Sequence, residues 1–147
     1  MPQKPIIRAA QRDDLQAWRA LWDAYCATLG ATIPAAVTTS LWQRILDANH
    51  PVGCLVACGS WNEPVGFAHY ILHPHTWSLQ PVCYLEDLFV APEARRLGAG
   101  RHLIERLVTM GRDHGWRRVY WHTHDDNLPG RALYDRLTKG PTMFAMT

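Results

Sequence analysis

No stretch of this sequence is long and apolar enough to cross a membrane, and no secretory leader is evident at its amino end. Internal repeats, low-complexity tracts and linkers are absent as well. We therefore expect a cytoplasmic protein with no membrane partner, whose 147 residues form one domain, 1–147, that can bury a core. Apolar residues make up 48% of the chain, which argues against disorder.

The sequence also has little excess of charge of either sign: its formal net charge is +2. Basic and acidic residues are interspersed, so we expect no nucleic-acid partner. None of the four cysteines forms a Cys-x-x-Cys pair, and we expect reduced thiols in the core. Two His-x-His pairs, at 73–75 and 122–124, lack the further ligands that zinc requires, so no metal site is predicted.

Hydrophobic periodicity divides the remaining sequence into strands and helices. Strands are expected at 6–10, 52–58, 65–72, 82–90, 117–124 and 142–146. Helices are expected at 15–28, at 41–48 after the cap residues 38–40, from about 98 onward, and from about 128 to 137, with a loop at 31–37. This order predicts an α+β fold, in which helices flank a mixed, mostly antiparallel sheet.

The segment 90–103 joins a predicted strand to a predicted helix through a basic, glycine-containing turn. The first N–H groups of a helix have no partner within the helix, and the helix dipole adds partial positive charge there. Gly98 and Gly100 have no side chains to keep a phosphate away from these amides. Arg95, Arg96 and Arg101 add positive charge, so the turn is suited to a pyrophosphate.

The turn is not a Walker A loop, because no Lys-Ser/Thr follows its last glycine, and it lacks the third glycine of a dinucleotide fingerprint. It resembles the Arg/Gln-x-x-Gly-x-Gly/Ala loop of the GCN5-related N-acetyltransferase (GNAT) superfamily, diamine/histone acetyltransferase-like branch. Residues 86–95 (Glu-Asp-Leu-Phe-Val-x-Pro-Glu-x-Arg) and 127–135 (Asn-Leu-Pro-Gly-Arg-Ala-Leu-Tyr-Asp) are also similar to that family. The resemblance covers nearly the whole chain.

This resemblance implies a GNAT acyl-CoA N-acyltransferase fold with acetyl-CoA as cosubstrate. Backbone atoms of the turn would hold the coenzyme A pyrophosphate: Arg95, Arg96, Leu97, Gly98, Ala99, Gly100 and Arg101. In this fold the strands before and after the turn and its helix splay apart. Backbone N–H groups of Leu88, Phe89 and Val90 are then candidates to donate to the carbonyl oxygen that gains charge.

Tyr134 is the candidate general acid for the departing thiolate, a role that the family often gives to the tyrosine at this position. Asn127 lies about 10 Å away on the same side of the expected helix, where it can hydrogen-bond the pantetheine arm or fix the loop. A tyrosine packed against the sheet is the alternative interpretation of Tyr134.

Glu86 is the candidate residue that interacts with the acceptor amine. It either accepts the proton of the amine through water or binds the ammonium. Strand alternation places Glu86 on the same face as Leu88, with Asp87 on the opposite face as a structural hydrogen-bonding residue. The alternative for Glu86 is an ion pair with an arginine. A proton relay through His69, His122 or His124 is a further alternative.

The resemblance implies an N-acetyltransferase that moves an acetyl group directly to a primary amine of a small amine or polyamine. No cysteine lies in the two recognised motifs, so a covalent acetyl-enzyme has no obvious nucleophile. Protein lysine and amino-acid acceptors remain alternatives, as does an acyl-CoA-binding sensor without turnover. A homodimer is left open.

Overall fold

A single sheet organises the protein, whose computed structural model describes residues 4–122 and the backbone of residues 143–146. The sheet has six strands in the order in which they occur along the chain. They are β1 (Ile6–Ala9), β2 (Val52–Cys58), β3 (Pro64–His73), β4 (Val82–Val90), β5 (Val119–His122) and β6 (Met143–Met146). The predicted bounds of the second and fourth strands, 52–58 and 82–90, are those of β2 and β4.

The pairing of neighbouring strands changes from antiparallel to parallel at β4. The first four strands pair antiparallel, whereas β5 runs parallel to β4 and β6 parallel to β5. A parallel pair needs a crossover connection, and α3 (Ala99–His114) supplies it between β4 and β5. The predicted mixed α+β sheet is thereby confirmed. The expected helix at 128–137 lies outside the described residues.

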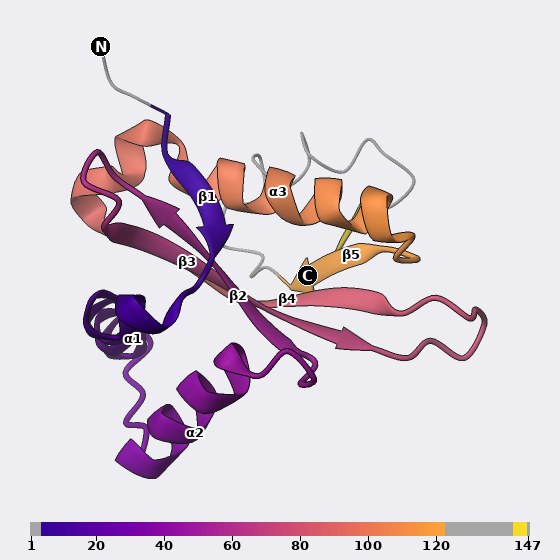
Figure 1. The fold of residues 1–147 in the computed structure, drawn as a ribbon, viewed down its shortest axis with the longest axis horizontal. Helices are drawn as coiled ribbons and strands as arrows, with labels where there is room; N and C mark the ends of the chain where they lie inside the picture. Colours follow the sequence, from indigo (N-terminus) through magenta and orange to yellow (C-terminus); the bar gives the residue numbers. More distant parts are fainter. Residues whose placement is uncertain (1–3, 123–142, 147) are drawn as a thin grey trace.

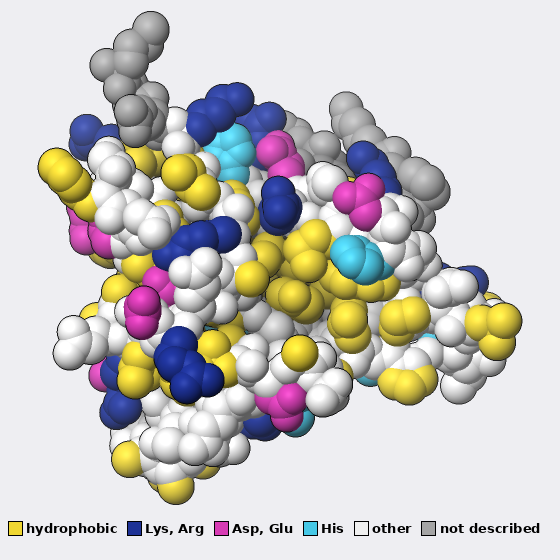
Figure 2. All heavy atoms as spheres, viewed as in Figure 1, with side chains coloured by type: hydrophobic (Ala, Val, Ile, Leu, Met, Phe, Trp, Pro, Cys, Tyr) yellow, Lys and Arg dark blue, Asp and Glu magenta, His cyan; other side chains and the backbone are white. Residues whose placement is uncertain are grey.

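Helices cover both faces of the sheet. One face packs on α3, while the other packs on α1 (Leu15–Thr28) and α2 (Ala35–Leu46) (Figure 1). The α3 side is mainly aliphatic, with Leu103, Ile104 and Leu107 fully buried against the strands. The α1 side is aromatic, and its buried members include Trp18 and Phe67. Figure 2 shows hydrophobic side chains gathered between α3 and the strands on the visible face.

The second helix begins earlier than the sequence predicted. Pro34, with φ −59°, occupies the position before Ala35, where its fixed φ and missing N–H suit a helix start. Thr38 is therefore not a cap but lies in the first turns of α2, where its buried hydroxyl accepts a hydrogen bond from Nε1 of Trp22 at 3.1 Å. The expected loop at 31–37 accordingly ends at Pro34, and α2 ends at Leu46 rather than near Ala48.

A bulge in β4 interrupts the predicted alternation of Glu86 and Asp87, the acidic pair of this strand. Tyr70 is opposite Leu85 and His69 is opposite Asp87, so Glu86 is an extra residue in β4. Alternation is broken there: Leu85 and Leu88 both pack toward α3, and Asp87 bonds to residues on the α1 side. The prediction that Glu86 shares a face with Leu88 assumed unbroken alternation, which the extra residue interrupts.

Within residues 4–122 and 143–146, no helix combines the length and apolar character needed to span a bilayer.

Candidate active site

The glycine turn has the predicted strand–turn–helix geometry. A short 3-10 segment, Pro92–Leu97, leads to Gly98, whose φ of 71° and ψ of 27° lie in the left-handed region that favours glycine. The first hydrogen bond of α3 runs from the N–H of His102 to the carbonyl of Gly98 at 3.0 Å. The N–H groups of Ala99, Gly100 and Arg101 come before that bond, so they are available to an anion at the helix N-terminus.

A cleft of about 460 Å³ opens at this end of α3. It is lined by seven residues, all of them predicted for the cofactor: Leu88, Phe89, Val90, Arg95, Gly98, Gly100 and Arg101. Three other predicted residues do not line it. Arg96 is exposed, Leu97 is half-buried, and the Ala99 side chain is fully buried in the core, which leaves only its backbone for a ligand.

The residues of this cleft fit a pyrophosphate. A Cβ added at Gly100 would lie 3.8 Å from Cγ2 of Val90 and 4.0 Å from Cδ2 of Leu88, which is ordinary contact distance. The protein therefore has room for a side chain here, and glycine leaves that room to a ligand beside the end of β4. Together with the guanidinium of Arg101 and the helix dipole, this space suits a close-approaching anion.

Arg95 is partly engaged by the protein itself. Its Nε donates to the carbonyl of Val90 at 3.1 Å, and its guanidinium carbon lies 6.0 Å from the centre of the Phe89 ring. Arg95 thus ties the basic turn to the last residue of β4. Its remaining N–H groups add charge to the cleft.

The ladder between β4 and β5, the strands on either side of α3, is short within the described residues. The parallel ladder joins β4 to β5 only over Cys83–Leu85 and Val119–Trp121. Beyond Leu85, the described part of β5, which ends at His122, contributes no partner to β4. Leu88, Phe89 and Val90, the predicted backbone donors, belong to this part of the strand. Tyr134 and Asn127 lie outside the described residues.

Asp87 is held at the bulge by a buried chain of hydrogen bonds. Its carboxylate accepts from the Tyr25 hydroxyl at 2.9 Å and from Nδ1 of His69 at 2.9 Å, and Nε1 of Trp18 donates to Nε2 of His69 at 3.0 Å. Because an indole can only donate, the proton of His69 must be on Nδ1. Both imidazole nitrogens are then engaged within the protein, and this arrangement fixes Asp87.

This chain predicts a measurable stability cost. Tyr25→Phe removes a donor to a largely buried carboxylate, so the free energy of unfolding should fall by about 1.5–3 kcal/mol in urea denaturation. Tyr70→Phe is the matched control, because the hydroxyl of Tyr70 makes no hydrogen bond among the described residues. An equal loss in the two variants would show that the bond to Asp87 contributes nothing.

Sequence reasoning assigned Tyr25 to the core and did not connect His69 with Asp87. His69 and Asp87 are 18 residues apart along the chain, Trp18 and His69 are 51 apart, and Tyr25 and Asp87 are 62 apart, so no local pattern joins them. One signal was present: His69 stands in the otherwise apolar centre of β3 and is only 2% exposed. A buried polar side chain in such a strand needs a partner.

Glu86 itself is exposed and forms no ion pair with an arginine among residues 4–122. Partial desolvation, and then the neighbouring carboxylate of Asp87, raise the pKa of Glu86, whereas His69 and His122 act to lower it. This side chain is therefore an available acidic group close to the cleft, as either predicted role requires.

All four cysteines are buried, and none lines the cleft. Burial raises the pKa of each thiol, to about 12 for Cys83. A buried thiol that remains protonated is a poor nucleophile.

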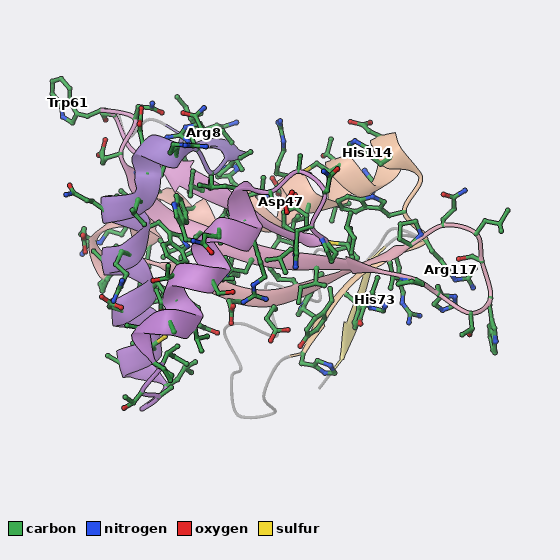
Figure 3. All side chains as sticks on the ribbon, turned by 60° about the horizontal axis from the view of Figure 1, so that its bottom comes forward. Arg8, Asp47, Trp61, His73, His114 and Arg117 are labelled. Carbon is green, nitrogen blue, oxygen red and sulfur yellow. The ribbon has the colours of Figure 1, made fainter. Side chains whose placement is uncertain are left out.

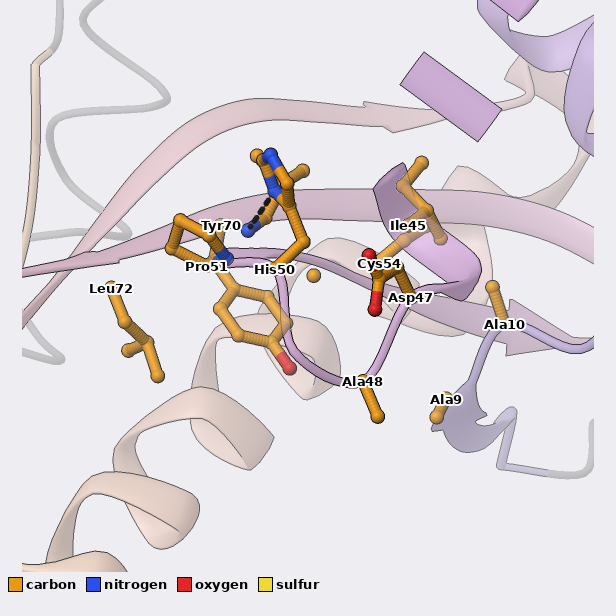
Figure 4. Close-up of a pocket in the computed structure, with 12 residues that line it drawn as sticks. Ala9, Ala10, Ile45, Asp47, Ala48, His50, Pro51, Cys54, Tyr70 and Leu72 are labelled. Carbon is orange, nitrogen blue, oxygen red and sulfur yellow. Dashed lines mark hydrogen bonds between the residues drawn. The ribbon is translucent and has the colours of Figure 1, made fainter. Parts of the chain in front are cut away.

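A second pocket, of about 230 Å³, lies where β1 ends beside β2 (Figure 4). Two of its polar side chains bond locally: Asp47 accepts the N–H of Asn49 at 2.9 Å, and Nδ1 of His50 accepts the N–H of Val52 at 3.3 Å. No predicted site residue lines this pocket. In the described part of the chain, no three His, Cys, Asp or Glu side chains gather in a way that could hold a metal ion.

Comparison with known proteins gives one consistent result. The family model "Acetyltransferase (GNAT) family" matches residues 15–138. The D-amino-acid N-acetyltransferase of Saccharomyces cerevisiae is 32% identical over 133 residues, which cover 90% of this chain and 83% of the yeast protein. The aminoglycoside N(6')-acetyltransferase type 1 of Stenotrophomonas maltophilia is 30% identical over 134 residues, covering 88% and 82% of the two chains.

The fold agrees with these matches. The crystal structure of a probable acetyltransferase superimposes with a TM-score of 0.81 at 22% sequence identity, covering 90% of this chain and 87% of the other.

Proposed function

Because this chain belongs to the acetyltransferase (GNAT) family and is an acetyl-CoA-dependent N-acetyltransferase, we propose that it transfers the acetyl group directly to a primary amine of a small amine or polyamine. The observation that carries the proposal is the cleft at the N-terminus of α3, which opens beside the end of β4 and close to the acidic residues of the bulge. When bound, acetyl-CoA supplies an activated acyl group as a thioester.

We assign cofactor binding, stabilisation of the acyl oxygen, binding of the amine and proton donation to residues of this chain. The N–H groups at the start of α3, with Arg101, hold the pyrophosphate. Backbone N–H groups of β4 beyond the bulge donate to the acyl oxygen. Glu86 receives the amine, and Tyr134 donates a proton to the sulfur that leaves.

The burial of the cysteine thiols favours direct transfer of the acetyl group. A covalent acetyl-enzyme needs a nucleophile within reach of the cleft, yet every cysteine is buried and has a raised pKa. The amine of the acceptor is then the attacking group itself.

An amino-acid acceptor is the second candidate, and one observation favours it. The yeast relative that spans 90% of this chain is a D-amino-acid N-acetyltransferase. The carboxylate of such an acceptor would need a cation, whereas the groups nearest the cleft on β4 are Glu86 and Asp87. We therefore place simple amines and polyamines first.

The test is release of coenzyme A thiol across a panel of diamines, monoamines, D- and L-amino acids and lysine peptides. The highest kcat/KM is expected with a simple amine or polyamine. If only amino acids or only peptides are acetylated, the acceptor belongs to that class instead. Thermal stabilisation by acetyl-CoA without turnover of any acceptor would instead identify a sensor.

A further inference from the structure

The connection between β3 and β4 carries two exposed apolar side chains. Trp77 is 83% exposed and Leu79 is fully exposed, and both belong to residues 74–81, which join the two strands. The connection is ordered by its own contacts: the N–H of Trp77 donates to Nδ1 of His75 at 3.1 Å, and the two rings meet edge to face. Large apolar side chains held in water by an ordered turn are typical of an interaction surface, because burying them is favourable.

The same end of the hairpin is basic. Residues 72–82 and 115–120 contain no Asp or Glu. The two segments lie side by side, because the N–H of Arg117 donates to the carbonyl of Pro81 at 2.9 Å. The side chain of Arg117 is exposed and forms no ion pair in the part of the chain that the structure describes. With Arg118 next to it, this position adds positive charge beside the exposed apolar side chains.

A pocket of about 250 Å³ is hollowed into this end of the hairpin. The residues that line it are Leu72, His73, Pro74, His75, Ser78, Leu79 and Pro81. One wall is held in place by His73, whose Nε2 lies 2.7 Å from the hydroxyl of Tyr120 on β5. The pocket is smaller than typical small-molecule sites, which measure about 300–1,000 Å³. It therefore suits a single side chain of a protein partner.

This surface lies far from the coenzyme A cleft. The cleft is at the N-terminus of α3, whereas Arg117 follows its C-terminus, and 16 helical residues span about 24 Å. Figure 1 shows the β3–β4 connection beyond the C-terminal end of α3. Figure 3 shows His73 and Arg117 toward that end, away from α1 and α2. A partner bound there would leave the cleft open.

We infer that residues 73–81, with Arg117 and Arg118 beside them, form a docking surface for an acidic segment of a partner protein. Arginine pairs its N–H groups with carboxylates, and Trp and Arg are enriched where protein partners meet. Trp77, Leu79 and the pocket would take up an apolar side chain of the same segment. A bilayer is a poorer match, because it has no side chain to place in the pocket. The inference goes beyond the proposed function and does not depend on which amine is acetylated.

The probe is a fluorescein-labelled peptide, Glu-Glu-Phe-Glu-Asp-Leu-Glu-Glu, whose binding to the full chain is followed by fluorescence anisotropy at low salt. Trp77→Ala and Arg117→Glu should each weaken binding by about ten-fold or more, while their affinity for acetyl-CoA should be unchanged. Trp61→Ala is the matched control, because Trp61 is 89% exposed in the turn between β2 and β3. Arg106→Glu, at an exposed position of α3, is the control for charge. Both controls should keep the affinity for the peptide.

Further measurements distinguish the other possible occupants. The same peptide with Ser in place of Phe and Leu should bind about ten-fold more weakly, and equal binding would overturn the inference by showing a purely ionic contact. Co-sedimentation with phosphatidylcholine–phosphatidylserine vesicles tests a membrane, and analytical ultracentrifugation tests a second copy of this chain. If Trp77→Ala abolishes binding to vesicles or a dimer while the peptide does not bind, the surface has that occupant and the inference is overturned. Failure of the unaltered chain to bind the acidic peptide also overturns it.

Discussion

Gly98→Ala is expected to weaken coenzyme A binding by about ten-fold or more, which corresponds to about 1.4 kcal/mol. The methyl group meets no protein atom closer than 3.9 Å, so it does not clash inside the fold. It instead occupies the surface where an anion approaches the first amides of α3. Isothermal titration with coenzyme A measures the effect.

A glycine elsewhere in the same helix provides the control. Gly115, which ends α3, has the same φ of 71° and ψ of 27° as Gly98, and a Cβ there meets nothing within 4 Å. Both alanine variants should therefore lose about 1–2 kcal/mol of stability through left-handed strain. Only the Gly98 variant should lose affinity for coenzyme A. Equal affinities in the two variants would place the pyrophosphate elsewhere.

Tyr134→Phe is expected to lower kcat by about 100-fold or more, which is the lower range for loss of a positioned general acid. The affinity for coenzyme A should change little, because the phenyl ring remains. Steady-state kinetics with an amine acceptor, measured across pH, tests this role.

The appropriate comparison is Tyr70→Phe, which removes a phenol that lines the second pocket rather than the cleft. That variant should keep its kcat. If the pH profile of Tyr134→Phe matches that of the unaltered protein, the acid is another group, and Tyr134 serves only to pack its helix.

Local sequence was enough for the elements that position the cofactor. The strand 82–90, the glycine turn and the helix after it are set by side-chain periodicity and by backbone sterics, which act over a few residues. The cleft residues Gly98, Gly100 and Arg101 could therefore be named before the fold was known. The start of α2 was misplaced, because Thr38 suits a cap in sequence but is buried against Trp22 in space.

The acidic pair was only partly predictable. Alternation along β4 assigned Glu86 and Asp87 to opposite faces, but the extra residue in the ladder depends on how β3 and β4 pair. Asp87 was correctly suspected of a structural role. Its partners Tyr25 and His69 could not be identified, because they come from α1 and β3.

The sequence by itself determined the order of the elements, the glycine turn before α3 and the absence of a cysteine in the recognised motifs. Only the tertiary structure decided that Glu86 is an extra residue in β4, where the described ladder between β4 and β5 ends, and how Asp87 is held. The reason is physical: periodicity and glycine conformation are properties of neighbouring residues, whereas ring contacts and donor–acceptor pairs join residues that are distant in sequence and meet only when the sheet has formed.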